Sequence, residues 1–398
     1  MTDFERSEEL INRLKNLRDS LGLTGMRIAM LCYIYPSPER PYYAGFFHSL
    51  ARIYKDLFPL LVLIPTLEDK REYEYEGVKV KWEHPPEIFR ETFIFHPDIL
   101  LVLAPSLSFL AQNLASFLIE IYNLPSITFF FGSDALYIPF YIPISSLKGI
   151  PKRLIFTEFI RMLHLREYLR ERNERGDYIV HISNWQRKAC EKSTFYKARN
   201  VKIIPCPVDT RIFRFQPRKG KVGKLICVRP HWSRKYAVDL VIRASRGKYE
   251  THIYGEGSWL YKHMALARKL KANVKFFPKF FTYQSELAET YLQYDMGLML
   301  SRADTQGVSA CEMQATGLPV ITSAVQAIPE FATGGTILIK NSEVNRVEEI
   351  IDDINERGIL EELSWKAHKG IVEKCGIEKV MREHLLLFHQ LLNERKLL

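Results

Sequence analysis

Short hydrophobic runs rich in Val, Ile, Leu and Phe recur along the first half of the chain, and amphipathic stretches separate most of them. Runs of this kind are typical of strands buried on both faces of a parallel sheet, and the amphipathic stretches predict helices that cover it. The predicted strands of this first series lie at 27–35, 60–66, 98–105, 126–134 and 178–183.

A second series of hydrophobic runs begins near Asn200, and it alternates with predicted helices at 236–246, 258–271, 284–293 and 308–316. Alternating strands and helices predict a parallel sheet covered on both faces. The chain is therefore expected to be an α/β protein with two Rossmann-like domains. The predicted strands of the second series are 201–205, 224–230, 251–257, 274–280, 295–301 and 318–323.

The pattern predicts where the domains begin and end. Residues 1–25 form a helical extension, 26–183 the first domain, 184–208 a hinge and 209–377 the second domain. The last helix, 378–398, is expected to cross back to the first domain. Ligands of open α/β sheets bind beyond the carboxyl ends of the strands, so the two sheets are expected to face each other across a cleft that holds the site.

Composition narrows the class of protein further. The chain has 398 residues, 47% of them hydrophobic, which is ample for two cores, and its net charge is +10. That charge attracts phosphates, nucleic acid or anionic lipid without selecting among them. The basic residues are dispersed and form no recognised nucleic-acid motif, so no nucleic-acid partner is expected.

The six cysteines form no CxxC pair, and no histidine cluster accompanies them. This spacing predicts neither a zinc site nor a disulfide framework, and it fits a reducing cytoplasm. The N-terminal residues are too charged for a signal peptide. The most apolar region, 98–131, is interrupted by Pro105 and Pro125, so we expect strand, helix and strand there instead of a membrane span.

The segment LMLSRADTQGVSACEMQATGLPVITS contains the strongest candidate site. A strand is expected to end at Ser301, a loop to pass through Gly307, and a helix to start near Val308. The unpaired amides of Val308 and Ser309 at that helix start can hold a phosphate, and Gly307 lets the backbone come close.

Asp304 and Glu312 flank this anion site from the loop and from the helix. We expect both carboxylates to point into the cleft, where they can bind sugar and ribose hydroxyls. The alternative is that Asp304 only caps a turn and that Glu312 lies on the helix surface.

A second candidate lies after the strand at 224–228, where Arg229 is followed by Lys235. A guanidinium fork and an ammonium point charge after one strand suit a pyrophosphate. The alternative interpretation is a solvated basic loop.

Taken together, these segments resemble family 4 retaining glycosyltransferases, which have the GT-B fold. That family shows an acidic residue, seven residues and then Glu, which here are Asp304 and Glu312 followed by MQATGLPVIT. The first acid is usually Glu, so Asp304 is a departure. The family also has donor-phosphate ligands at or near Arg229 and Lys235. The spacing here is one residue longer, which makes Arg234 an alternative to Lys235.

Two further matches concern the donor side. THIYGEG, with Gly255 and Gly257, resembles the family's strand ending in Gly-x-Gly. The run VKFFPKFF places Lys279 where the family's backbone contacts the base. Gly45, at the start of the helix after PYYA, occupies the position of a glycine that approaches the donor phosphate, although an ordinary helix start explains it equally well.

The acceptor side departs from the family. FFFGSD resembles the family's His-Gly-Ser-Asp, but Phe131 stands in place of the histidine, so a catalytic role for that histidine does not transfer. Asp134 is expected to cap the next segment, and His48 is an alternative polar group that we expect to be structural. In the segment IIPCPVDTRIF, Cys206 and Pro207 replace the usual Asn and Gly, which predicts a stiffer hinge.

The resemblance implies a retaining, metal-independent, hexosyltransferase-type glycosyltransferase without a cofactor. Its donor would be a UDP-sugar or GDP-sugar, and its acceptor a glycan, a lipid-linked sugar or another hydroxyl compound in surface polysaccharide or glycoconjugate synthesis. Arg229, Lys235 and the amides of Val308 and Ser309 would stabilise the leaving diphosphate. Asp304 would hold the donor sugar and Glu312 the ribose. The alternatives are a sugar-nucleotide epimerase of the same fold and an inactive sugar-nucleotide-binding module.

The stretch 152–175 mixes apolar and basic residues, as helices at membrane interfaces do. It predicts contact with an anionic membrane surface, and thus a cytoplasmic protein that is peripheral on the inner face of the membrane. A solvated amphipathic helix is the alternative.

Overall fold

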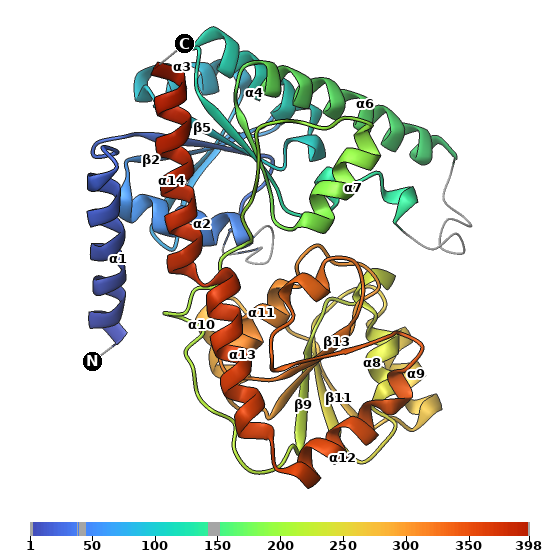
Figure 1. The fold of residues 1–398 in the computed structure, drawn as a ribbon. Coiled ribbons are helices and arrows are strands. Elements are labelled where there is room, and N and C mark those ends of the chain that lie inside the picture. The colour runs from blue at the N-terminus through green and yellow to red at the C-terminus, as the bar shows by residue number, and fades with distance from the viewer. Residues whose placement is uncertain (1–2, 38, 40–44, 142–151, 397–398) are drawn as a thin grey trace. The chain divides into compact units, whose positions relative to one another are not determined.

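The chain forms two units in a computed structural model, which describes residues 3–37, 39, 45–141 and 152–396. Unit 1 comprises Met1–Pro207 and Val380–Leu398, and unit 2 comprises Val208–Lys379. Each unit is an α/β fold with a sheet of its own (Figure 1).

The sheet of unit 1 has eight strands in the order β3-β4-β2-β1-β5-β6-β7-β8. Neighbouring strands are parallel except for the pair β3 and β4. The strands are β1 Ile28–Cys32, β2 Leu60–Pro65, β3 Arg71–Tyr75, β4 Val78–Glu83, β5 Ile99–Leu103, β6 Ser126–Phe130, β7 Tyr178–His181 and β8 Val201–Ile203.

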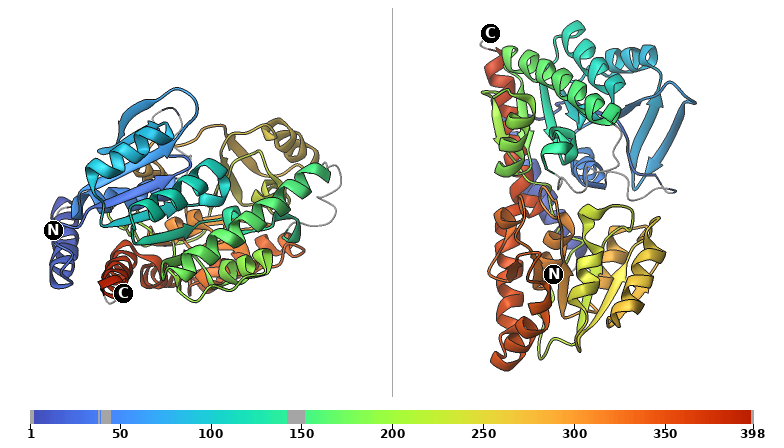
Figure 2. Two further views of the ribbon diagram at one scale, coloured as in Figure 1. Left: turned by 90° about the horizontal axis from the view of Figure 1, so that it is seen from above. Right: turned by 90° about the vertical axis from the view of Figure 1, so that its right-hand side faces the viewer.

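Helices cover both faces of this sheet (Figure 2). Right-handed crossovers place α3, α4, α6 and α7 on one face, because all of these helices connect strands in the same direction across the sheet. The crossover from β1 to β2 runs the other way and places α2 on the opposite face. The helices are α1 Asp3–Ser20, α2 Gly45–Leu57, α3 Pro85–Phe95, α4 Phe109–Ile121, α6 Lys152–Glu174 and α7 Asn184–Thr194, with 3₁₀ turns η1 Pro105–Leu107, η2 Ser133–Ala135 and η3 Ile138–Phe140.

The hairpin of β3 and β4 was not among the predicted strands. Tyr75 pairs with Val78, so Glu76 and Gly77 alone form the turn, and both have positive φ (44° and 77°). Two consecutive left-handed residues define the tight turn that joins antiparallel strands. The alternation in REYEYEGVKVKWE is the signal that could have revealed it.

The strand at 201–203 belongs to a different sheet from the one predicted. β8 pairs with β7 in parallel, and therefore completes the sheet of unit 1 instead of starting the second series. The segment 184–208 also contains helix α7, so most of the predicted hinge is regular structure of unit 1. The short run at 201–203 contains no information about which sheet it joins.

Unit 2 has a six-stranded parallel sheet in the order β11-β10-β9-β12-β13-β14. The strand β14 and the helices α12 and α13 were not predicted. The strands are β9 Lys224–Val228, β10 Glu250–Tyr254, β11 Val274–Phe277, β12 Met296–Met299, β13 Val320–Ser323 and β14 Thr336–Ile339. The helices are α8 Val238–Ala244, α9 Leu260–Leu270, α10 Gln284–Tyr291, α11 Val308–Ala315, α12 Val347–Arg357 and α13 Leu360–Cys375, with 3₁₀ turns η4 Arg234–Tyr236, η5 Ile328–Phe331 and η6 Val344–Arg346.

The last helix, α14 (Ile377–Lys396), begins in unit 2 and from Val380 onward is part of unit 1. Buried contacts attach it there: the Tyr54 hydroxyl lies 2.5 Å from Nδ1 of His384, and the ring of Phe388 packs on Tyr54 and Phe58. Nearer its end, the Tyr178 hydroxyl donates to Glu394 at 3.0 Å.

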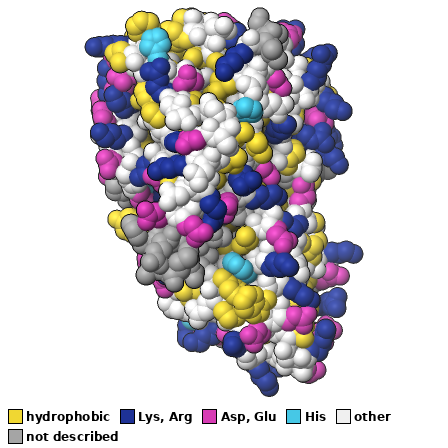
Figure 3. All heavy atoms as spheres, turned by 60° about the vertical axis from the view of Figure 1, so that its left-hand side comes forward, with side chains coloured by type: hydrophobic (Ala, Val, Ile, Leu, Met, Phe, Trp, Pro, Cys, Tyr) yellow, Lys and Arg dark blue, Asp and Glu magenta, His cyan; other side chains and the backbone are white. Residues whose placement is uncertain are grey.

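The surface is mixed in character. On the face shown in Figure 3, acidic and basic side chains are interspersed, and hydrophobic side chains form separate small groups. Within the part of the chain that the structure describes, no helix combines the length and the apolar character needed to cross a bilayer.

Asp177 holds α14 to the end of α6. Its carboxylate is fully buried, and it accepts from Arg395 at 2.7 Å and from the backbone N–H of Ser126 at 3.1 Å. It also forms ion pairs with Arg172 at 3.8 Å and with Arg175 at 3.6 Å. Arg172 is itself fully buried, and Asp177 is the fully buried acid among its ion-pair partners, which also include Glu171 at 3.5 Å and Glu120 at 4.0 Å.

We therefore expect Asp177→Ala to destabilise the protein by about 3–5 kcal/mol, since it removes the buried carboxylate that pairs with the three arginines Arg172, Arg175 and Arg395. Urea unfolding monitored by circular dichroism measures this change. The matched control is Glu174→Ala, which removes an exposed acid three residues away and should cost less than about 0.5 kcal/mol. Equal stability of the two variants would show that the buried cluster does not stabilise unit 1.

Candidate active site

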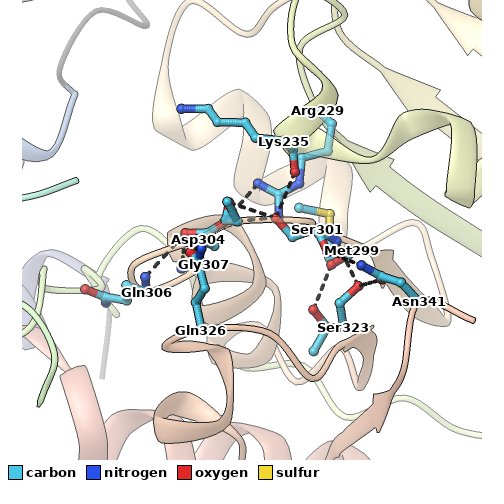
Figure 4. A network of polar contacts seen from close by, with 12 residues as sticks. Arg229, Lys235, Met299, Ser301, Asp304, Gln306, Gly307, Ser323, Gln326 and Asn341 are labelled. Carbon is cyan, nitrogen blue, oxygen red and sulfur yellow. Dashed lines mark hydrogen bonds and ion pairs between the residues drawn. The ribbon is translucent and has the colours of Figure 1, made fainter. Parts of the chain in front are cut away.

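The carboxyl ends of β9 and β12 bring Arg229 and Asp304 together in unit 2. The two strands are neighbours in the sheet, and each residue lies in the loop that follows its strand. Nη1 and Nη2 of Arg229 both lie 3.4 Å from Oδ2 of Asp304 (Figure 4). The Arg229 side chain is buried, and its Nε has no hydrogen-bond partner among the described residues.

The second oxygen of Asp304 closes the turn before α11. Oδ1 accepts from the backbone N–H of Gly307 at 2.8 Å and of Gln306 at 3.3 Å. The backbone N–H of Asp304 in turn donates to Oε1 of Gln326 at 2.9 Å. Asp304 thus caps a turn, as the alternative interpretation stated, and it also contacts the candidate phosphate ligand Arg229.

Gly307 is the residue immediately before α11, and its position requires glycine. Its φ is +77°, and a Cβ there would lie 2.6 Å from Cδ1 of Ile328. Its carbonyl accepts from the N–H groups of Ala310 and Cys311. The N–H groups of Val308 and Ser309 have no acceptor among the described residues, so both are available to an anion at this helix start.

Glu312 lies one turn into α11 and is buried, which contradicts the surface alternative. No hydrogen-bond partner of its carboxyl group occurs in the described part of the chain. Burial raises the pKa of Glu312 to about 8. A buried carboxyl group without a protein partner is suited to a ligand that brings hydroxyl groups.

Lys235 lies in η4, where its backbone carbonyl is hydrogen-bonded but its side chain is exposed. Its carbonyl accepts from the N–H of Arg302 at 2.8 Å and from the Ser301 hydroxyl at 3.2 Å, which fixes the turn against the end of β12. Its side chain is exposed and extends away from the Arg229–Asp304 pair (Figure 4), with Nζ 4.8 Å from the Tyr236 ring. Arg234 is also exposed, so the structure leaves Lys235 and Arg234 as alternatives.

Sequence reasoning missed the residues that join the strand ends beneath the site. Oγ of Ser323 accepts from the N–H of Ser301 at 2.9 Å and donates to Oδ1 of Asn341 at 2.6 Å. Nδ2 of Asn341 donates to the carbonyl of Ser301 at 3.0 Å. These bonds connect the carboxyl ends of β12, β13 and β14. Ser301 and Ser323 could have been found from the sequence, because each is a small polar residue at the end of a predicted strand.

Lys279 is not part of this network. Its Nζ pairs with Oε1 of Glu286 at 2.9 Å and lies 4.9 Å from the Phe281 ring, and both charged side chains are largely exposed. Any contact that it makes with a nucleotide would therefore require this ion pair to open or would use its backbone.

Gly45 is the first residue of α2 in unit 1. A Cβ on Gly45 would meet no atom within 4 Å, so the fold of unit 1 does not require glycine there. The preceding residues 40–44, among them Ala44 of the predicted Ala44-Gly45 step, lie outside the described residues.

Phe131 has an aromatic environment in unit 1. Its ring stacks on Phe46 with centroids 4.7 Å apart and lies edge-on to Phe47 at 4.9 Å. Asp134 accepts from the backbone N–H groups of Phe131 and Gly132, and burial raises its pKa to about 6. Asp134 thus has the capping contacts expected of it, and His48 is buried between Tyr35 and Glu76 at 2.9 Å from each.

The raised pKa of Glu312 makes stability depend on pH. A carboxyl whose pKa is higher in the folded than in the unfolded chain costs stability as pH rises between its usual value near 4.5 and about 8. We expect Glu312→Gln to melt at least about 3 °C above the wild type at pH 9 and within about 1 °C of it at pH 5. Differential scanning calorimetry across this range measures both. A difference that does not change with pH would show that Glu312 is not buried as a neutral acid.

The chain is similar to known proteins both in sequence and in fold. Residues 209–366, most of unit 2, match the family described as Glycosyl transferases group 1. An uncharacterized 41.2 kDa protein in the cps region of Klebsiella pneumoniae is 29% identical over 119 residues, which cover 29% of this chain and 32% of that protein. The chain thus matches only about a third of that relative's length.

Solved structures are similar over nearly the whole chain. The sucrose-phosphate synthase of Thermosynechococcus elongatus superposes with a TM-score of 0.69 at 15% identity, covering 93% of this chain and 100% of that one. Anabaena HepE in complex with UDP gives 0.63 at 12% identity, covering 92% and 100%. Both have two parallel-sheet domains, as this chain does. The match to the Glycosyl transferases group 1 family is thus confined to the C-terminal unit, whereas the similarity to solved structures extends over both units and shows that the chain has the GT-B fold.

Proposed function

We propose that this protein is a glycosyltransferase that transfers a hexose, with retention, from a UDP-sugar or GDP-sugar to a hydroxyl group of a glycan or lipid-linked acceptor. The pathway we propose is surface polysaccharide or glycoconjugate synthesis, which the similarity to a capsule-region protein supports. The UDP bound to Anabaena HepE supports the donor class. The single observation that carries the proposal is the buried guanidinium of Arg229: its Nε has no partner among the described residues, and it contacts the same Asp304 carboxylate that closes the turn before the two available amides of α11.

The contact between Arg229 and Asp304 leaves room for a donor. A strong ion-pair hydrogen bond is about 2.7–2.9 Å long, whereas both nitrogen–oxygen distances here are 3.4 Å. A diphosphate can therefore take guanidinium N–H groups without the loss of a strong protein bond. Asp304, fixed through Gly307, is then positioned for the hydroxyls of the donor sugar.

Glu312 is proposed to bind the ribose. Its carboxyl group lies one turn along α11 from the amides of Val308 and Ser309, which is the order of ribose and phosphate in a nucleotide. Hydroxyl groups from ribose would provide the partners that the described residues do not.

Bond breaking at the anomeric carbon leaves negative charge on the β-phosphate. Arg229, Lys235 and the α11 amides are proposed to stabilise that charge, and each acts more strongly in the transition state than in the ground state. The protein supplies these positive groups itself, so we propose that transfer needs no metal ion. The departing phosphate oxygen would accept the proton of the attacking hydroxyl on the same face, which gives retention.

Arg229→Ala should lower kcat/KM at least about 100-fold, because it removes a donor aimed at the developing charge. The first measurement is a thermal-shift panel of UDP-, GDP-, ADP- and TDP-sugars, and the second is release of nucleoside diphosphate with the best donor. The matched control is Arg243→Ala, which removes an exposed arginine from α8 and should change neither. Unchanged turnover in Arg229→Ala would contradict the assignment.

The same assay separates the alternatives. Binding of a nucleotide-sugar without diphosphate release, across many acceptors, would indicate an inactive binding module. An epimerised donor formed without any acceptor would indicate an epimerase. Activity that persists in excess EDTA is expected, and its loss would contradict the proposed metal independence.

A further inference from the structure

The first turns of α6 expose large apolar side chains. The exposed fractions are 49% for Leu154, 65% for Phe156 and 42% for Phe159, and Leu163 is 38% exposed. Leu154 and Phe156 are separated by about 200° around the helix axis, yet both are exposed. The first turns of α6 are therefore exposed on more than one side. Figure 1 shows that this N-terminal end of the helix projects from the body of unit 1. We name Leu154, Phe156, Phe159 and Leu163 the α6 apolar patch.

Arg161 holds this projecting turn at the carboxyl edge of the sheet. Its guanidinium donates to the carbonyl of Leu136 at 2.6 Å, to the Ser106 hydroxyl at 2.9 Å and to the carbonyl of Asp134 at 3.1 Å. Ser106 follows β5 and Asp134 follows β6, so both mark the strand ends where ligands of such sheets bind. The α6 apolar patch lies on the turns of α6 that precede and follow this anchor in the sequence.

The charge of unit 1 is concentrated around the same helix. Residues 152–202, which form α6, β7, α7 and β8, contain 13 Lys and Arg against 6 Asp and Glu, a net charge of +7. Residues 1–149 contain 14 against 18, a net charge of −4. Arg153, Arg166 and Lys188 are exposed members of the basic set.

We infer that unit 1 docks on an anionic lipid bilayer by inserting the α6 apolar patch between headgroups, with the surrounding basic residues against the lipid phosphates. Exposed aromatic and aliphatic side chains on a projecting helix, flanked by cations, match the two requirements of interfacial binding. The net charge of +7 over residues 152–202 is complementary to the negative surface potential of an anionic bilayer.

This inference goes beyond the proposed function and does not depend on it. If transfer occurs as proposed, docking at the carboxyl edge favours a lipid-linked acceptor over a free glycan, because the acceptor would reach unit 1 from the bilayer surface. Vesicle binding is measured without donor, so its failure is distinguishable from failure of diphosphate release with a soluble acceptor.

The test is flotation of the full chain with phosphatidylcholine vesicles containing about 30% phosphatidylglycerol, compared with pure phosphatidylcholine. The wild type should bind only the anionic vesicles, and binding should fall at least about tenfold between about 50 mM and about 500 mM salt. Phe156→Ser combined with Phe159→Ser should weaken binding at least about tenfold by removing inserted apolar area. Donor hydrolysis and melting temperature should remain those of the wild type.

The matched control is Phe93→Ser combined with Ile94→Ser on α3, whose side chains are 56% and 62% exposed. They lie in the segment 68–98, which has 5 Lys and Arg against 9 Asp and Glu. This control should bind vesicles as the wild type does. Loss of binding in both double variants, or in neither, would overturn the inference. So would a dimer that Phe156→Ser with Phe159→Ser converts to a monomer without any vesicle binding, because the patch would then be an interface between copies.

Discussion

Parallel pairing of neighbouring strands, with right-handed crossovers, is the constraint on which both units depend. It places the carboxyl ends of β9 and β12 side by side and so brings Arg229 within 3.4 Å of Asp304, although 74 residues separate them in the chain. The same constraint in unit 1 places Ser106 after β5 beside Asp134 after β6, where Arg161 contacts both. Each unit thus has an arginine whose position is set by two strand ends, but their surroundings differ. Arg161 is bonded by carbonyls, a hydroxyl and the carboxylate of Glu158, whereas Nε of Arg229 has no partner among the described residues.

The hydrophobic pattern predicted most of the fold because buried parallel strands are continuous apolar runs. It failed where that signal is weak or ambiguous. The hairpin β3–β4 alternates charged and apolar residues along an edge of the sheet, and its turn is a Glu-Gly pair, so no apolar run marks it. For β8, three residues suffice to predict a strand, but only the pairing with β7 shows which sheet they join.

The candidate site likewise has features that the sequence predicted and features that it could not predict. The segment from Asp304 to Glu312 could be predicted because a strand, a glycine and a helix start are all local features. The burial of Glu312 could not, because it depends on packing around α11 by elements distant in the chain, among them α13. Lys279 shows why a role cannot be transferred from position in the sequence alone: the resemblance predicts a contact with the base, but in the structure the side chain pairs with Glu286. The serines and the asparagine beneath the site are structural residues of this sheet, whose role depends on three strands ending together.

Phe131 stands where the resembled family has a histidine, and the packing of its ring shows what this residue does in unit 1. The ring stacks on Phe46 and abuts Phe47 and Phe129, so a polar side chain at this strand end is exchanged for part of an aromatic cluster. Asp134 cannot take over proton transfer readily, because the backbone N–H groups of Phe131 and Gly132 already occupy its oxygens. His48 is likewise held between Tyr35 and Glu76. On the proposed mechanism the charged groups of the reaction must then come from unit 2 and from the donor itself. The leaving phosphate is the base that remains when the acceptor side presents an aromatic surface.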